Sequence, residues 1–383
     1  MKSQIKERQF DFVLLIFIVV LLGAGILMLS SSSFVRGSYI SDDAMFFMRH
    51  QILLGAGGFV AMILISFVNY RLYKRLAGYI LLGAITFNYL TIIIGTVRND
   101  AQRWLKVGPK TFQPSELLKV ALIIYIAAVL SDEKWGESSK SWTGFLTLLL
   151  PIGVSLLAVV LQKHMSATII ILVICFALLA FGGVKWYMFA SIIAGGTGAF
   201  FLVKKIKPDL FEHVQTRLDV YKATVFGNTG AIPEGIGEEA VSQIRNSILA
   251  IGSGGMWGLG FGKSIQKYSY LPEAYTDFIF AITAEELGFA GVVAILLVYA
   301  FFFMRGFKVA IHAEDKFGML IAAGIMIMMV LQTILNISVV SALIPVTGVS
   351  LPLFSYGGTS IVVVLGSLGI LLNIARHSRY PKL

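Results

Sequence analysis

Runs of about 20 apolar residues recur along this chain and constrain its fold more than any other feature. A helix rises about 1.5 Å per residue, so about 20 apolar residues are needed to cross roughly 30 Å of bilayer hydrocarbon. The first run, 12–31, follows a basic start and is longer than the apolar part of a signal peptide, so we interpret it as a retained span. Only 14% of the 383 residues are charged, against about a quarter in soluble domains.

The sequence therefore predicts an all-α polytopic membrane protein with about ten transmembrane helices. Ten spans put both termini on one side, and the distribution of Lys and Arg in the short loops predicts that this side is the cytoplasm. We expect the whole chain, 1–383, to form a single integral membrane domain with a large extracellular loop, 204–276, between the seventh and eighth helices. The expected spans are 12–31, 51–69, 78–96, 113–130, 144–161, 166–183, 186–203, 277–304, 317–341 and 353–375.

Charge and cysteine content exclude some classes of function. The formal net charge of +10 comes from cations scattered over the loops without a dense basic stripe, so we expect no nucleic-acid partner. The single cysteine, Cys175, lies in an apolar run and cannot form an intramolecular disulfide. The five histidines show no metal-ligand spacing, and the sequence leaves any metal site unknown.

Polar residues gather in four stretches, of which the first runs from Arg103 to Lys119. It begins in a short outer loop whose cations break the positive-inside trend, which suggests an anion site. Pro114 suits the first turn of a helix, and Glu116 and Lys119 share one helix face. A charge in hydrocarbon costs roughly 2.5 to 3.5 kcal/mol, so this pair should face the bundle interior or a wet cavity. A capping pair that only orients the loop is the alternative.

The second stretch, 243–267, is rich in glycine. Its backbone amides, together with Lys263 and Lys267, could bind phosphate, although a flexible turn at the membrane surface explains the glycines equally well. The apolar piece 244–251 suggests an amphipathic helix on the membrane.

The third stretch, 270–280, leads into the eighth expected span. Asp277 lies where the outer loop meets the bilayer, so loss of hydration could raise the pKa of its carboxylate towards values useful to a base. Alternatively, Thr276 and Asp277 only cap the N-terminus of the helix. Glu285 and Glu286 follow too deep for idle surface charges, so at least one should pair with a cation or a hydrogen-bond donor.

The fourth stretch, 336–360, contains Pro345, Pro352 and the pair Gly357–Gly358. These residues break the helical pattern at the outer edge of the last two spans. Irregular backbone at membrane depth must be buried in protein or line a cavity, which predicts an outward-facing pocket wall. A packed structural turn is the alternative.

Together the four stretches resemble the SEDS family (shape, elongation, division and sporulation), whose members include FtsW, RodA and SpoVE. The segment 43–51 is more similar to the FtsW and SpoVE types than to RodA, which favours an FtsW-like protein. The segment 162–168 departs from the Gln-Pro-Asp-Leu-Gly-Thr sequence common in the family. The matching blocks occur in family order over nearly the whole chain, at 103–116, 250–255, 271–280, 285–288, 345–348 and 355–358.

This resemblance implies a peptidoglycan glycosyltransferase that polymerises lipid II at the outer face of the bacterial cytoplasmic membrane. The expected partners are lipid II, an undecaprenyl-pyrophosphate-linked glycan, a class B penicillin-binding protein and other membrane proteins of the divisome or elongasome. No organic cofactor is expected, but a divalent cation, Mg²⁺ or Mn²⁺, could help the protein's own cations to stabilise the leaving pyrophosphate.

Asp277 looks like the family's essential aspartate, and we expect it to be the catalytic base. Glu285, Glu286 and Pro345 are expected to be structural or intramembrane polar positions. The residues expected to bind substrate are Arg103, Trp104, Glu116, Lys119, Arg217, Gln243, Arg245, Ser247, Ser253, Lys267, Thr276, Ser355 and Tyr356.

Two other functions stay open at this point. A transporter that flips lipid II would also need a lipid groove and an anion site, and the intramembrane polar residues Glu285, Glu286, Gln332 and Asn336 are compatible with one. A non-catalytic scaffold for the transpeptidase is the other. The sequence does not distinguish division from elongation or sporulation.

Overall fold

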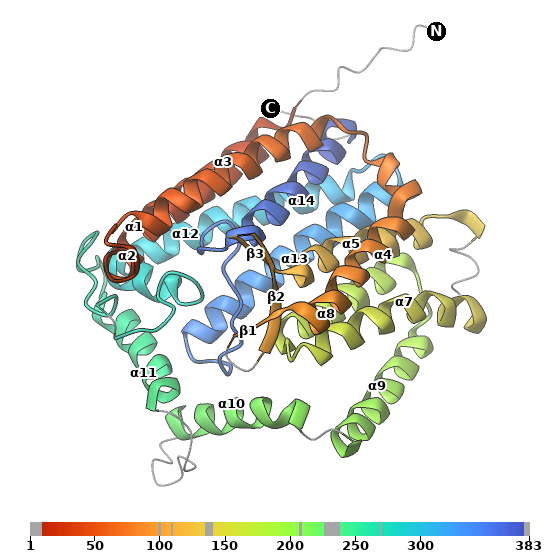
Figure 1. Cartoon of the computed structure of the whole chain (residues 1–383). Helices are drawn as coiled ribbons and strands as arrows, with labels where there is room; N and C mark the ends of the chain where they lie inside the picture. Colours follow the sequence, from red (N-terminus) through yellow and green to blue (C-terminus); the bar gives the residue numbers. More distant parts are fainter. Residues whose placement is uncertain are drawn as a thin grey trace, which may run out of the picture.

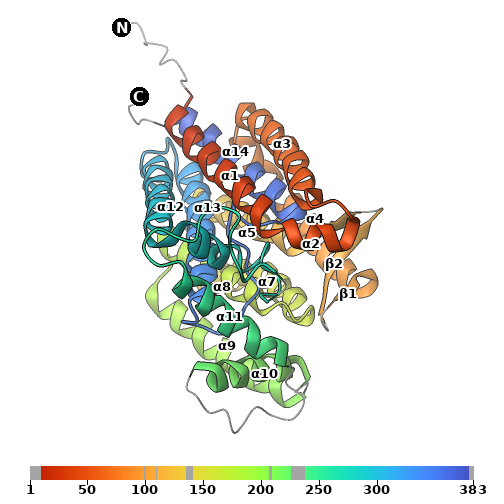
Figure 2. The same ribbon diagram turned by 90° about the vertical axis from the view of Figure 1, so that its left-hand side faces the viewer.

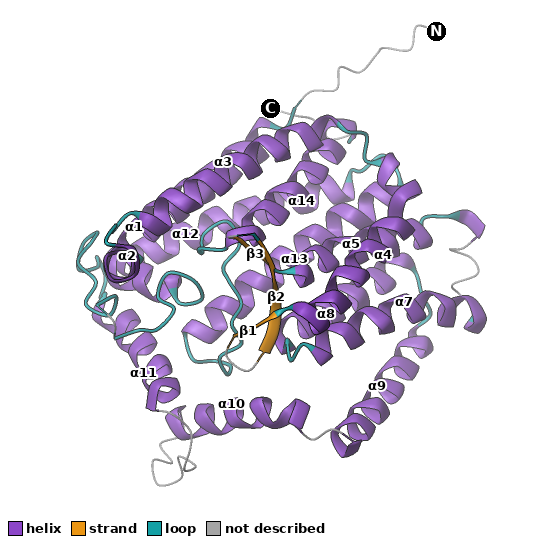
Figure 3. Ribbon diagram, viewed as in Figure 1, coloured by secondary structure: helices purple, strands orange, loops and turns teal. Residues whose placement is uncertain are grey.

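The computed structural model describes residues 10–98, 101–108, 110–134, 141–206, 209–225, 238–268 and 270–378. Its long helices form a bundle, and the strands are few and short (Figures 1 and 3). Eight described helices are long and apolar enough to span a membrane, so the chain is a multi-pass membrane protein. They are α1 (Phe12–Ser32), α3 (Phe46–Phe67), α4 (Arg71–Ile94), α7 (Trp142–Leu161), α8 (Met165–Gly182), α12 (Ile279–Ile311), α13 (Lys316–Val340) and α14 (Gly358–His377).

Two further helices lie at the positions of the remaining expected spans. They are α5 (Pro114–Leu130), which has 17 residues, and α9 (Trp186–Ile206). Pro114 occupies the first turn of α5, as predicted. The helical membrane fold is thus confirmed, whereas the count of ten spans stays a prediction.

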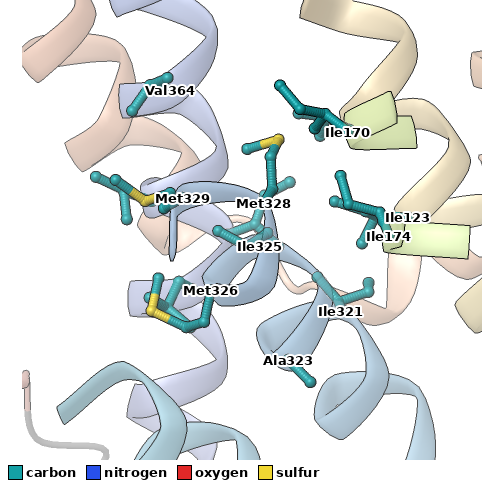
Figure 4. Close-up of a cluster of buried hydrophobic side chains, with 14 of the residues drawn as sticks. Ile123, Ile170, Ile174, Ile321, Ala323, Ile325, Met326, Met328, Met329 and Val364 are labelled. Atoms are coloured by element: carbon teal, nitrogen blue, oxygen red, sulfur yellow. The ribbon is translucent and has the colours of Figure 1, made fainter. Parts of the chain in front are cut away.

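Helix α13 lies in the centre of the hydrophobic core. Its buried side chains face neighbours on two sides: Ile321 lies towards Ile123 of α5 and Ile174 of α8, whereas Met326 and Met329 lie on the side of α14 (Figure 4). A helix that is apolar all round needs such an interior position.

Ion pairs between helix ends distinguish the two ends of the bundle. At one, which we call the Arg71 end, Asp11 before α1 pairs with Arg305 near the end of α12 at 3.1 Å. There Arg71 at the start of α4 also pairs with Asp315 before α13, at 3.0 Å. The first and last described residues lie together at this end in both views (Figures 1 and 2). The opposite end, which we call the Asp277 end, holds the candidate site.

A small antiparallel sheet interrupts the all-α pattern at the Asp277 end. It consists of β1 (Thr96–Arg98), β2 (Ala101–Val107) and β3 (Lys110–Phe112), with Thr96 opposite Trp104 and Leu105 opposite Phe112. We had expected a plain loop here. The sheet fixes the direction of β2, which carries Arg103.

The long connection after α9 contains two helices, α10 (Asp209–Val225) and α11 (Glu238–Ser253), which follow the lower and left edges of the molecule in Figure 1. The helix expected around 244–251 is therefore present as part of α11. A short helix, α2 (Phe34–Ser41), follows α1.

Candidate active site

Asp277 lies in the loop that joins α11 to α12, and its backbone is held in place by α13. The amide of Asn336, which is 1% exposed, donates to the carbonyl oxygens of Asp277 and Val349, both at 2.7 Å. Helix α12 begins at Ile279, so its N-cap residue is Phe278, which makes no side-chain capping bond. The interpretation of Asp277 as a helix cap is therefore wrong.

The Asp277 side chain is half-buried, and burial is the largest cause of a pKa raised to about 7. The negative charge of Glu273 raises this pKa further, whereas the cations Arg217 and Arg103 lower it. A Cβ on Gly348 would lie 3.4 Å from Oδ2 of Asp277, so the segment after α13 forms part of the wall around this carboxylate. A carboxyl group with such a pKa can accept a proton near neutral pH.

Two arginines from distant parts of the chain lie close enough to Asp277 to lower its pKa electrostatically. Arg103 on β2 donates from Nη2 to the carbonyl of Lys163 at 2.5 Å, and Arg217 on α10 donates from Nη1 to the carbonyl of Val346 at 2.8 Å. Burial lowers the pKa of Arg103 to about 10 and also lowers that of Arg217, but arginine keeps its proton at neutral pH. The buried Nε of Arg103 has no hydrogen-bond partner among the described residues, so the site holds a donor that an anion would satisfy.

Glu116 and Lys119 form the pair that their spacing predicts. Their side chains are 13% and 1% exposed, and the Nζ and Oε1 atoms lie 2.7 Å apart. A buried ion pair at the start of α5 agrees with the interior position expected for these charges.

His164, between α7 and α8, belongs to the same region, although no motif in the sequence predicts a role for it. Its Nδ1 lies 3.2 Å from Oγ of Ser115, and burial together with the charges of Arg103, Lys119 and Arg217 holds its pKa well below the usual range. The imidazole is therefore neutral. The sequence feature that could have pointed to His164 is the departure of 162–168 from the family sequence.

The glycine-rich segment packs against a break in helix α12. Helix α12 is broken at Gly288, whose φ is 67°, and the segment 255–260 occupies the break. The amides of Leu259 and Gly260 donate to the carbonyls of Glu285 and Glu286 at 3.0 Å. On the other side of the break, the amides of Phe289 and Ala290 donate back to Gly255 and Met256. The amides of Leu259 and Gly260 are therefore already bonded and not available to a phosphate, and phosphate binding by the rest of the segment stays a prediction.

The two glutamates that follow Asp277 are both paired. Glu285 accepts from Oγ of Ser264 and, at 2.9 Å, from the amide of Ile265. Glu286 accepts from Nζ of Lys267 at 2.9 Å and from Oγ of Ser31 at 2.5 Å. The pairing that we expected for at least one of them is observed for both, and it fastens the loop to α12 and α1.

Several residues expected to bind substrate make hydrogen bonds within the protein, and their role towards a ligand stays a prediction. Gln243 donates to Pro272, Ser247 to Val340, Ser253 to Ala250, Thr276 to Glu273 and Lys267 to Gly262 and Glu286. Ser355 accepts from Leu351, and the amide of Tyr356 donates to the carbonyl of Tyr275. Arg245 is exposed, and Trp104 and Pro345 are half-buried.

Within the described residues, no three His, Cys, Asp or Glu side chains come together in a way that could hold a metal ion. Asp277 and Glu273 interact electrostatically, and Glu116 is already paired with Lys119. A metal held by protein ligands alone does not fit these residues.

Comparison with known proteins identifies relatives over the whole chain. Residues 12–380 match the family model of the cell cycle proteins FtsW, RodA and SpoVE. Stage V sporulation protein E of Bacillus subtilis (strain 168) is 35% identical over 98% of this chain and 99% of its own length. A probable peptidoglycan glycosyltransferase FtsW of Geobacter sp. (strain M18) is 34% identical over 97% of this chain and 98% of its own.

Solved structures share the fold. A chain from a peptidoglycan synthase complex that coordinates polymerization and crosslinking superposes with a TM-score of 0.71 at 24% identity, covering 96% of this chain and 98% of that one. The rod shape determining protein RodA of Thermus thermophilus gives a TM-score of 0.67 at 24% identity, covering 97% of this chain and 98% of its own.

Proposed function

The chain belongs to the FtsW/RodA/SpoVE family of cell cycle proteins, and from this premise we propose that it is a peptidoglycan glycosyltransferase that polymerises lipid II. The single observation that carries the proposal is the half-buried carboxyl group of Asp277, with a pKa of about 7 and two arginines around it. The reaction takes place at the outer face of the bacterial cytoplasmic membrane, and both termini lie in the cytoplasm.

In the proposed reaction the 4-hydroxyl of an incoming lipid II attacks the anomeric carbon of a lipid-linked glycan. The new glycosidic bond forms as the bond to undecaprenyl pyrophosphate breaks, and Asp277 takes the proton of the attacking hydroxyl. General base catalysis of this kind contributes typically about 100-fold to 10,000-fold in rate. The raised pKa serves the step because the base is ionised in a useful fraction at neutral pH.

The leaving pyrophosphate gathers negative charge, which fixed cations stabilise when water is excluded. Arg103 and Arg217 are the best placed for this role because they interact with Asp277, and Arg103 has an unpaired buried donor. Lys119 lies close enough to the same region to influence His164, although Glu116 already pairs with it. Lys267 is the weakest candidate, since Glu286 neutralises its charge.

A divalent cation stays a prediction. Mg²⁺ commonly binds through one or two carboxylates together with substrate phosphates, so Asp277 and Glu273 would be its protein ligands. No step of the proposed reaction is routed through it.

We further propose that the chain works with a class B penicillin-binding protein, a transpeptidase, and with divisome or elongasome proteins. The support is the shared fold with a chain of a peptidoglycan synthase complex. The segment 43–51 favours an FtsW-like division role, although the relatives include a sporulation protein of comparable identity.

The contacts of the intramembrane polar residues weaken the transporter alternative. Glu285 and Glu286 fasten a loop, and Ser31, which binds Glu286, is the penultimate residue of α1, so these carboxylates lie near the Asp277 end. Asn336 holds the Asp277 backbone. A transport path would need polar groups along the full membrane depth, and these residues instead cluster towards one end.

The test is polymerisation of labelled lipid II by the purified full-length protein, with and without a cognate transpeptidase. Asp277→Ala should lower the rate about 100-fold or more. Asp42→Asn is the matched control, because Asp42 is exposed at the same end and its φ of 52° is one that asparagine tolerates. Wild-type protein that flips lipid II in vesicles but forms no glycan in either condition would favour transport. Growth that survives Asp277→Ala would favour a scaffold.

A further inference from the structure

A cavity of about 280 Å³ lies at the Arg71 end, between the start of α4, the end of α5 and the start of α13. Four cations line it, Arg71, Lys74, Arg75 and Lys316, against one carboxylate, Asp315. Helices α4, α5 and α13 each connect this end with the Asp277 end, so the cavity and the candidate active site lie at opposite faces of the membrane. Sites for drug-sized ligands measure about 300 to 1,000 Å³, so a cavity just below this range has the size to hold a lipid head group.

One of the four cations is neutralised by neighbouring carboxylates. Arg71 pairs with Glu314 at 2.9 Å and with Asp315 at 3.0 Å. Counting both carboxylates against the four cations, the surroundings of the cavity carry a net charge of +2.

The other three cations pair with no carboxylate of the described residues. Nζ of Lys74 donates to the carbonyl of Ser131 and Nζ of Lys316 to that of Gly182, both at 3.2 Å, and a neutral carbonyl leaves the positive charge in place. Arg75 is exposed and makes no ion pair or hydrogen bond with any part of the chain that the structure describes. These side chains can turn towards an anion without breaking a salt bridge.

An apolar stripe continues from the cations along α4. Arg71, Arg75, Gly78 and Leu82 lie on one face of the helix, because positions four, seven and eleven residues apart coincide at 3.6 residues per turn. Gly78 has no heavy atom within 4 Å of the position of a Cβ, and Leu82 is 63% exposed. The stripe therefore offers open apolar surface at hydrocarbon depth, directly beyond the charged group.

We propose that this cavity binds the phosphate group of an anionic phospholipid from the leaflet at the Arg71 end, with an acyl chain along the stripe of Gly78 and Leu82. Basic pockets between transmembrane helices at the cytoplasmic side are a known way to hold phosphate-bearing head groups. A free phosphate would use the same cations but would gain nothing from the stripe. The inference is independent of the proposed catalytic function.

The test is native mass spectrometry of the full-length protein in detergent, titrated with phosphatidylglycerol or with zwitterionic phosphatidylcholine. Wild-type protein should bind phosphatidylglycerol more tightly. The double variant Arg75→Gln/Lys316→Gln should bind it about 30-fold more weakly, which corresponds to about 2 kcal/mol for two juxtamembrane cations. Lys308→Gln removes an exposed cation from the last turn of α12 at the same end and should bind like wild type.

Arg75→Gln alone guards against a folding defect, since it removes charge without removing a described contact, and it should weaken binding about 5-fold. Equal binding of phosphatidylglycerol by wild type and Arg75→Gln would overturn the proposal, as would equal binding of the two lipids by wild type. Inorganic phosphate at millimolar concentration should leave the bound phosphatidylglycerol in place. Displacement by phosphate would assign the cavity to the free anion and overturn the lipid proposal.

Discussion

The carboxyl group of Asp277 titrates at about pH 7, mainly because burial removes water from its charged form. A general base works only when it is deprotonated, so kcat/KM for lipid II polymerisation should rise with pH through about 7 and level off above it. The measurement is a pH profile of kcat/KM, which reports the pKa of the free enzyme.

Substitutions of two residues near Asp277 should shift the acidic limb of this pH profile in opposite directions. Glu273→Gln removes a negative charge that raises the pKa of Asp277, so the limb should shift to lower pH, while the glutamine still offers an oxygen to Thr276. Arg217→Gln removes a cation that lowers the pKa, so the limb should shift to higher pH. An identical limb in all three proteins would mean that another group titrates.

Asn336 should matter for both stability and catalysis, because its amide joins the Asp277 loop to the segment after α13. Asn336→Leu leaves two carbonyls without their donor, which costs about 1 to 3 kcal/mol. We expect a lower unfolding temperature and a lower kcat. Gln332→Leu is the matched control on the same helix: the buried Oε1 of Gln332 has no partner in the described part of the chain, so its loss should be neutral or stabilising. Equal effects of the two substitutions would contradict the positioning role.

Residue spacing predicted some of these contacts and could not predict others. Glu116 and Lys119 are three residues apart on one helix, so their pairing follows from helix geometry alone. Arg103, Arg217 and Asp277 come from three separate segments, and only tertiary structure brings them together. The pairing of Lys267 with Glu286 likewise depends on how the loop packs, so the sequence suggested a free cation where the structure has a neutralised one.

At the scale of elements, the break in α12 depends on glycines that bring two backbones into contact. A Cβ on Gly258 would overlap the carbonyl oxygen of Glu286, and φ at Gly258 is 78°. Gly258→Ala should therefore release the loop, lowering the unfolding temperature and raising amide exchange over 255–260. Gly252→Ala is the control, because Gly252 lies in α11 with no atom within 4 Å of a Cβ, and alanine there should be neutral or stabilising by up to about 1 kcal/mol. Equal exchange in both variants would contradict the docking role.

Apolar runs located the helices well but misplaced the starts of three of them: α14 begins at Gly358, five residues after its expected start, and two other helices begin earlier than expected. We expected spans at 51–69 and 78–96, whereas α3 begins at Phe46 and α4 at Arg71. Both omitted turns carry charged or polar side chains at a membrane face, such as Arg49 and Lys74, whose long stems let helices extend beyond the hydrocarbon. Hydropathy reports the apolar length of a helix and leaves out such turns.

At the scale of the whole molecule, the sequence predicted the multi-pass helical bundle because a bilayer accepts few other solutions. The sequence did not indicate the small sheet at 96–112, because its strands are only three to seven residues long and contain charged residues. The sequence also did not show what the glycine-rich loop packs against. The loop packs into the break of α12 at Gly288, and only the structure reveals this break.

The positions of the cations predict how the bundle is oriented in the membrane. Arg71, Lys74, Arg75, Lys308 and Lys316 all lie at the Arg71 end, and the positive-inside rule assigns such an end to the cytoplasm. The single cysteine makes this easy to test, because Cys175 is buried in α8 and Cys175→Ala provides a background without thiols. Lys106→Cys on β2 should then react with a membrane-impermeant maleimide in intact cells.

A cysteine in place of His312, exposed at the end of α12, should react only after the membrane is permeabilised. Each position is the control for the other, since both are exposed and each lies at a different end of the bundle. The reverse pattern would place Asp277 in the cytoplasm, where lipid-linked glycan strands are not assembled in the proposed reaction. It would also place the cation-lined cavity in the outer leaflet, so one labelling experiment bears on both sites.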